Sequence, residues 1–251
     1  MEVPHVHSSR PTQRCCAGRS EDPARGDALA GSQLLYIAVT QLHAGGEANN
    51  HAVIFAAYAG SGRWTAVHVA QFAAMALITA GLVTLCFSLD LGREGAAWAA
   101  RLGAFASATA LALYAVLQAV DGVGNKQVDA AWVGASGVER SAFFASAEAM
   151  RWLEWGVRSY HDYALGLALL LVSGAAVGAR AALCPRPVGY LVGLSGVAYL
   201  VQGWLVGSEG FSGKHTALIL AAWGLSLAWM VWLALLAWRA VGRHDRGSSS
   251  L

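Results

Sequence analysis

Apolar runs long enough to cross a lipid bilayer recur along the chain. A membrane helix needs about 20 mainly apolar residues. Five segments meet this requirement: 64–89, 97–120, 162–183, 187–208 and 215–239. A sixth, 28–46, is shorter, because only about its first fifteen residues are clearly apolar. The pattern predicts an all-α fold, a polytopic transmembrane helical bundle of about six spans.

The connection from 121 to 161 is the only long one between these spans. Its second part reads "GVERSAFFASAEAMRWLEWGVRSY", in which Glu148, Arg151, Glu154 and Arg158 recur every three or four positions with aromatic residues between them. This spacing predicts an amphipathic helix on the outer face of the membrane before the fourth span. The alternative is that the fourth span itself extends beyond the bilayer.

Composition favours a membrane protein and argues against other classes. Hydrophobic residues make up 56% of the chain and charged residues only 13%, whereas soluble domains carry about 25% charged residues. The net charge of +2 and the absence of a dense basic run argue against nucleic acid as a partner. The four cysteines form neither a CxxC nor a Cys/His zinc spacing. The expected partner is the lipid bilayer.

Six spans place both termini on the same side of the membrane. Eleven of the 17 lysines and arginines then lie on that side, which favours cytoplasmic termini in the cell (inner) membrane. Residues 1–27 are rich in Pro, Arg and Ser and are expected to form a disordered cytoplasmic tail. The predicted organisation is completed by a six-helix transmembrane domain over 28–241 and a cytoplasmic C-terminal tail over 242–251.

Small residues mark the expected helix contacts. Three GxxxG pairs allow close approach of helix backbones: Gly174/Gly178, Gly189/Gly193 and Gly203/Gly207. The short sequence "CPRP" joins the fourth and fifth spans. These two spans are therefore predicted to pack as an antiparallel hairpin.

Polar residues gather at the predicted outer mouth of the bundle. Five of the eight histidines fall there: His43, His51, His68, His161 and His215. Trp64, His68 and Gln71 share one helix face, and Tyr114, Gln118 and Asp121 repeat that spacing on the third span. Because polar groups are costly against lipid, they are expected to face an outward-facing cavity between spans two, three, four and five. The candidate pocket residues are His68, Gln71, Gln118, Asp121, Glu154, Arg158, His161 and Gln202.

The polar residues at the predicted mouth also have purely structural interpretations. His43, His51 and His215 lie at or beyond helix ends, where solvation is expected. Charged residues of the segment 154–162 are spaced for helical ion pairs, and the glutamines are spaced to bridge helices by hydrogen bonds. Asp121 begins "DGVGN", a turn-forming run that would end the third span.

Three functional hypotheses follow from the polar mouth. The favoured one is binding of a small amphiphilic molecule or a lipid, without catalysis or a cofactor. The second is a metal or haem site that uses His68 and His161, with Asp121 or Glu154 as further ligands. The third is a membrane-embedded hydrolase, although HExxH and GxSxG motifs are absent from the sequence. No catalytic residue is assigned.

Two stretches carry a resemblance to a known family. They are "AEAMRWLEWGVRSYHDYALGLALLLVSGAAVGA" with the following "CPRPVGYLVGLSGVAYLVQGWLVGSEGF", and "HAVIFAAYAGSGRWTAVHVAQFAAMALITAGL" from 51 to 82. The matching positions are Gly166, Gly174, Pro185, Gly189, Tyr190, Gly193, Gly196 and Tyr199. The chain resembles a domain-of-unknown-function family of uncharacterised bacterial six-span integral membrane proteins, over about 200 residues. The resemblance implies a six-span fold in a bacterial inner membrane and no reaction. Residues 1–27 and the short first span depart from the family pattern.

Overall fold

The fold is entirely helical in the part of the chain that the structure describes. This structure is a computed structural model, and it describes residues 23–89, 91–179 and 184–248. The elements in order are α1 (Pro23–Thr40), α2 (His51–Gly60), α3 (Trp64–Ser88), α4 (Glu94–Ala119), the π-helical segment η1 (Val120–Asn125), α5 (Lys126–Gly134), α6 (Gly137–Gly178), α7 (Arg186–Glu209) and α8 (Gly213–Ser248).

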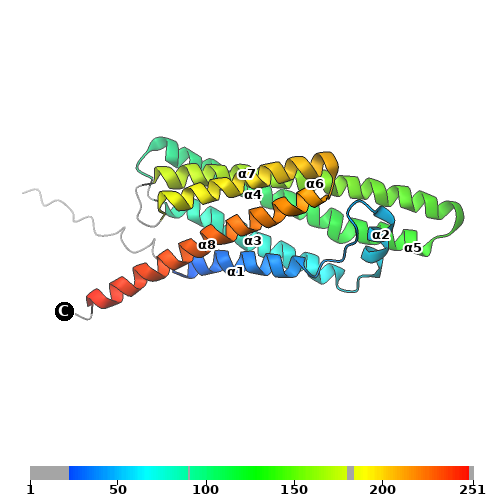
Figure 1. Ribbon diagram of the computed structural model, residues 1–251, viewed down its shortest axis with the longest axis horizontal. Helices are drawn as coiled ribbons and strands as arrows, with labels where there is room; N and C mark the ends of the chain where they lie inside the picture. The colour runs from blue at the N-terminus through cyan, green and yellow to red at the C-terminus, as the bar shows by residue number, and fades with distance from the viewer. Residues whose placement is uncertain (1–22, 90, 180–183, 249–251) are drawn as a thin grey trace, which may run out of the picture.

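Six helices run lengthwise through the bundle in alternating directions: α1, α3, α4, α6, α7 and α8 (Figure 1). The helix α6 packs against α4 and α7, while α1 packs against α3 and α8. The short helices α2 and α5, with the first half of α6, extend beyond the bundle at one end, which we call the α5 end (Figure 1). The start of α1 and the end of α8 lie at the opposite end.

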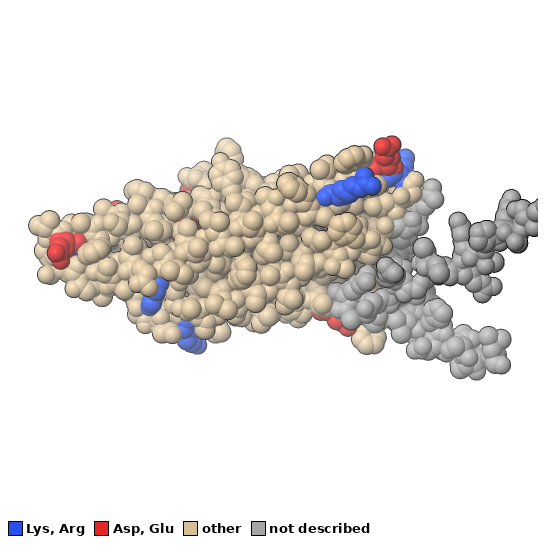
Figure 2. All heavy atoms as spheres, turned by 180° about the vertical axis from the view of Figure 1, so that it is seen from behind, with Lys and Arg blue, Asp and Glu red and all other residues tan. Residues whose placement is uncertain are grey.

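Five helical stretches within the described residues are long and apolar enough to cross a membrane: Trp64–Ser88, Glu94–Gly134, Gly137–Gly178, Arg186–Glu209 and Gly213–Arg239. Large apolar side chains cover their outward faces, including Phe72, Phe105, Val201, Trp204 and Leu220. The face seen in Figure 2 carries its charged side chains toward its two ends. An apolar surface on this scale suits lipid contact. The predicted membrane-protein helical bundle is therefore supported.

The helical backbone that begins with α4 does not stop at Asp121, as the sequence "DGVGN" suggested. It continues through η1 into α5, so that Glu94–Gly134 forms one uninterrupted helical stretch of 41 residues. The chain absorbs the two glycines by widening one turn into a π-helix instead of breaking the helix. The prediction of a turn at this point was wrong.

The amphipathic segment before the fourth span is likewise part of a longer helix. It forms the first half of α6, which runs for 42 residues without a break. A separate outer-face helix is therefore not seen, and the alternative of an extended fourth span describes the structure. The helix can continue because its charged side chains are neutralised by partners inside the protein, as described below.

Glycines bring α6 and α7 into close contact, and the predicted antiparallel hairpin is confirmed. A Cβ atom on Gly166 would lie 2.8 Å from the carbonyl oxygen of Gly196 on α7. The hydroxyls of Ser159 and Ser173 donate to the carbonyls of Gly203 and Gly189, respectively. Backbones at this separation gain dispersion and hydrogen bonds that larger residues would prevent.

Both predicted tails are partly helical. The helix α1 begins at Pro23 and α8 continues to Ser248, so helical backbone reaches into the segments 1–27 and 242–251. Residues 1–22 and 249–251 lie outside the described residues.

Candidate functional site

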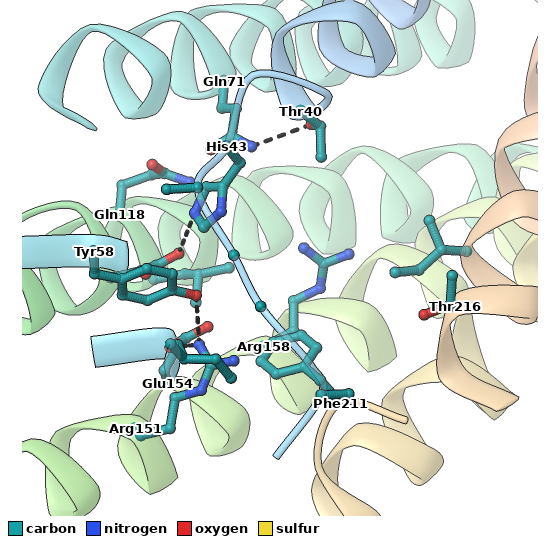
Figure 3. Close-up of a pocket in the computed structure, with 18 of the residues that line it drawn as sticks. Thr40, His43, Tyr58, Gln71, Gln118, Arg151, Glu154, Arg158, Phe211 and Thr216 are labelled. Carbon is teal, nitrogen blue, oxygen red and sulfur yellow. Dashed lines mark hydrogen bonds and ion pairs between the residues drawn. The ribbon is translucent and has the colours of Figure 1, made fainter. Parts of the chain in front are cut away.

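A cavity of about 330 Å³ opens at the α5 end, where α2 and the extension of α6 meet the bundle (Figure 3). Its lining comes from α1, the segment 41–50, α2, α3, α4, η1, α6 and the start of α8. The fifth predicted span, α7, contributes no residue to it. The cavity predicted between spans two, three, four and five is therefore displaced toward α1 and α8.

The structure divides the predicted pocket residues into two groups. Five of them line the cavity: Gln71, Gln118, Asp121, Glu154 and Arg158. His68 contacts the cavity wall through Asp121, whereas His161 and Gln202 are buried deeper, between α4, α6 and α7. Gln202 contacts the cavity only indirectly, since its amide nitrogen donates to Asp162, the ion-pair partner of Arg158.

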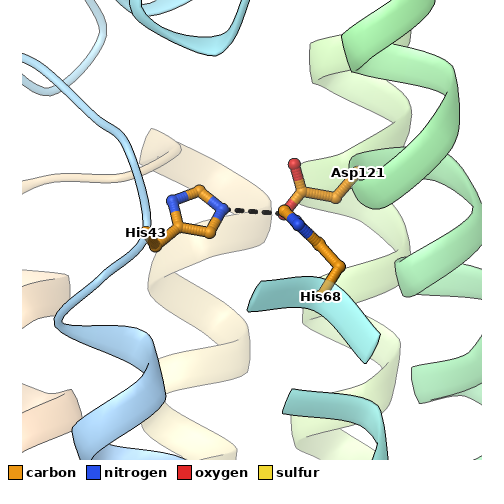
Figure 4. Close-up of side chains that lie close together, drawn as sticks. All are labelled: His43, His68 and Asp121. Atoms are coloured by element: carbon orange, nitrogen blue, oxygen red, sulfur yellow. Dashed lines mark ion pairs between the residues drawn. The ribbon is translucent and has the colours of Figure 1, made fainter. Parts of the chain in front are cut away.

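Three side chains from separate elements meet at the cavity rim (Figure 4). The Nε2 atom of His68 lies 3.2 Å from Oδ2 of Asp121, and Nε2 of His43 lies 3.5 Å from the same oxygen. Each residue offers one atom that could bind a metal ion, and these three atoms lie within 4.8 Å of one another. We call this cluster of His43, His68 and Asp121 the His–His–Asp cluster.

His43 was missed by sequence reasoning, which placed it in solvent. Its side chain is only 19% exposed, and its ring packs against the rings of Tyr58, Trp64 and His68. Burial lowers the pKa of His43, but the hydrogen bond and the negative charge of Asp121 outweigh it, so the pKa is raised from its ordinary value. No spacing in the sequence signals this contact, because 78 residues separate His43 from Asp121.

The other two histidines predicted to be solvated also have defined surroundings. His215 is 1% exposed and packs against Phe211, so its prediction was wrong. His51 is partly buried and pairs through Nδ1 with Glu148 at 3.0 Å.

His161 does not belong to the His–His–Asp cluster. Its Nδ1 atom hydrogen-bonds to the carbonyl of Ala110 at 2.9 Å, and its ring packs against Tyr114. Ala110 precedes Asp121 by eleven residues, which places His161 on the order of 15 Å deeper in the bundle at 1.5 Å rise per residue. The structure therefore separates His161 from His68, whereas it brings His43 and Asp121 next to His68.

The π-helical segment η1 positions Asp121 in the cavity wall. A π-turn frees backbone carbonyls from their usual helical partners, and such turns are frequent at functional sites. Here Trp64 Nε1 donates to the carbonyls of Asp121 (3.3 Å) and Gly122 (3.0 Å). Gly122 lies directly against His68, and a Cβ atom added there would be 3.0–3.1 Å from the His68 side chain. In the "DGVGN" run, Asp121 therefore provides the carboxylate, and Gly122 allows His68 to lie close to the helix backbone.

Replacing Gly122 with alanine is expected to displace His68 and lower the free energy of unfolding by about 1–2 kcal/mol, a typical cost of overpacking. The added Cβ would lie 3.0 Å from Cβ and Cγ of His68. Unfolding by SDS titration of the detergent-purified protein measures the change. Gly134→Ala is the matched control, since no atom lies within 4 Å of a Cβ there. Equal losses in the two variants would contradict the assigned packing.

A second network of buried charges forms the floor of the cavity. Arg151 Nη1 donates to Glu154 at 2.6 Å and to the hydroxyl of Tyr58 at 2.9 Å. Asn125 donates to both Glu154 (2.7 Å) and Asp121 (3.1 Å), which connects this network with the His–His–Asp cluster. The helical ion pairing predicted for the segment 154–162 is present between Arg158 and Asp162, but inside the protein.

Arg158 occupies the centre of the cavity. Its Nε atom donates to Asp162 at 3.2 Å, and its guanidinium points into the open space (Figure 3). Thr216 on α8 and Phe211 just before it also line the cavity. Tyr36 is a second polar neighbour of this side chain. Arginine carries five donors in a planar fork, so contacts with Asp162 and Tyr36 leave further N–H groups for a ligand.

The chain matches no family model, no curated protein and no solved structure. The resemblance to the six-span bacterial family therefore stays a prediction. The chemistry of the site has to be argued from its own residues. These residues provide two arginines, one imidazole and two carboxylates around a space of about 330 Å³.

Proposed function

We propose that this protein is a six-span membrane protein that binds a small amphiphilic molecule with an anionic head group in the cavity at its α5 end. The observation that carries the proposal is the guanidinium of Arg158, which is directed into the cavity from a partly buried position. Burying arginine is costly unless it is paired. A carboxylate or phosphate head group would add a bidentate partner to the contacts that Asp162 and Tyr36 supply.

The membrane topology belongs to the same proposal. The helix α1 would be the sixth span, because it packs between α3 and α8 and exposes Leu34 and Leu35 on its outer side. An even number of spans and the excess of arginine at the end that holds the termini support cytoplasmic termini in the cell membrane. The cavity then faces the outside.

The walls of the cavity suit an amphiphile. Beside the polar groups, Leu117, Ile219 and Trp223 contribute apolar surface. Pockets of this kind bind the apolar part of a ligand by burial and orient it with a few polar groups. A volume of about 330 Å³ accommodates a head group with a short chain and excludes a complete two-chain lipid.

Octanoate and octanol provide a direct test, since they share the chain and differ in the head group. We expect octanoate, measured by calorimetry on the purified protein, to bind at least about tenfold more tightly than octanol, as a difference of 1.4 kcal/mol would give. Arg158→Gln should abolish this preference, and Arg158→Lys, which keeps the charge without the fork, should reduce it.

The exposed Arg140, on the α6 extension, provides the matched control. Arg140→Gln should leave the preference unchanged. Equal binding of octanoate and octanol to the unmodified protein, or no binding of either, would overturn the proposal. A preference that survives in a folded Arg158→Gln protein would also overturn it.

A further inference from the structure

We infer that His43, His68 and Asp121 bind one divalent transition-metal ion of the zinc class at the rim of the cavity. The inference rests on the geometry of these three side chains and is independent of the anionic ligand proposed above. It assigns a metal to the His–His–Asp cluster, whose members come from the segment 41–50, α3 and η1.

The hydrogen bonding of His68 is the first argument. Its Nδ1 atom lies 2.8 Å from the carbonyl of Trp64, which can only accept, so Nδ1 carries a proton. In the neutral imidazole, Nε2 then presents a lone pair to the carboxylate of Asp121, 3.2 Å away. Two acceptors at this separation repel each other unless a cation lies between them. Metal-bound histidines typically donate their second ring N–H to a carbonyl in this way.

The separation of the donor atoms is the second argument. Zinc binds imidazole nitrogen and carboxylate oxygen at about 2.0–2.2 Å in a tetrahedron, so neighbouring ligand atoms lie about 3.3–3.5 Å apart. The two distances from histidine Nε2 to Asp121 Oδ2 are 3.2 and 3.5 Å. His43 lies on a segment without regular structure, which can adjust its position without repacking a helix.

The donor set selects the class of metal. Two imidazoles and one carboxylate suit zinc and neighbouring transition metals, whereas calcium and magnesium prefer oxygen ligands alone. Three protein ligands leave a fourth position, and His43 and Asp121 both line the cavity. The fourth position therefore faces the cavity, as in zinc sites that keep an exchangeable water.

A proton between Nε2 of His68 and Asp121 is the alternative to a metal ion. Titration with metal ions distinguishes these two possibilities. Full-length protein, purified through a tag without histidines and treated with a chelator, is titrated with Co²⁺ and Zn²⁺. We expect visible Co²⁺ absorption of a four-coordinate site, lost on addition of Zn²⁺. His68→Ala and Asp121→Asn should bind about one ion fewer per chain or bind it at least about 10–100-fold more weakly, the loss that even outer-shell changes cause.

Two controls make the result specific. The residues His5, His7, Cys15 and Cys16 can bind metal as well, so the difference between wild type and variants is the informative quantity. His51→Ala removes another histidine–carboxylate pair, with Glu148, and should leave metal binding unchanged.

Folding of each variant is checked by size-exclusion chromatography and thermal unfolding. If His68→Ala or Asp121→Asn fails to fold, His43→Ala replaces it, because His43 lies outside the helices. Wild type that gives no Co²⁺ absorption, or metal binding equal in wild type and in all folded cluster variants, would overturn the inference.

Discussion

Replacing Glu154 with alanine is expected to lower the free energy of unfolding by about 3–5 kcal/mol, because it leaves a buried guanidinium without its anion. Arg151 and Glu154 are both almost fully buried, and their side chains meet at 2.6 Å. The ring of Phe211 covers the guanidinium, with 4.6 Å from its central carbon to the ring centroid. On that side, the ring keeps water away from the guanidinium. SDS-titration or thermal unfolding in detergent measures the effect.

The double variant Arg151→Met/Glu154→Met tests the cause of that loss. Since it removes both charges, it should be more stable than Glu154→Ala, as apolar replacements of buried ion pairs often are. Glu209→Ala is the comparison at the surface, where the pair with Lys214 is exposed and contributes about 0–1 kcal/mol. A Glu154→Ala protein as stable as Glu209→Ala would show that Arg151 is reached by water.

The second large effect is expected at the contact between α6 and α7. Gly166→Val should lower the free energy of unfolding by about 3 kcal/mol or more, the upper range for overpacking. Its Cβ would lie 2.8 Å from the carbonyl oxygen of Gly196 and 2.9 Å from a methyl carbon of Leu200. The backbone contact cannot be relieved by rotating a side chain, so the helices must separate.

Gly156 provides the matched control on the same helix. No atom lies within 4 Å of a Cβ at that position, so Gly156→Val introduces the same side chain without a clash. Its helix propensity exceeds that of glycine, and the variant should be as stable as wild type or slightly more so. Comparable losses in the two variants would contradict the close approach of α6 and α7.

The charged half of α6 has a consistent role in this structure. Arg151, Glu154 and Arg158 are neither a solvated helix end nor a surface network, because all three line the cavity. Arg158 faces the proposed ligand, Arg151 and Glu154 hold Tyr58 and Asn125, and Asn125 contacts the His–His–Asp cluster. The cavity, the floor and the cluster form one connected polar region at the α5 end.

The sequence by itself determined the helical bundle, its apolar outer surface and the pairing of α6 with α7. These properties depend on local patterns: the length of apolar runs, the spacing of glycines and a short connection. Five of the eight predicted pocket residues also line the cavity. Gln71 and Gln118 lie inside predicted spans, where polar groups have to avoid lipid.

Only the tertiary structure decided which polar groups meet. The widening of α4 at η1 turns Asp121 toward His68, and the segment 41–50 brings His43 to the same carboxylate. The packing of α1 and α8 places the cavity beside them, whereas His161 is directed to Ala110. Contacts of this kind join residues far apart in the chain. They depend on helix rotation and depth, and hydrophobic periodicity does not specify these to within a side chain's length.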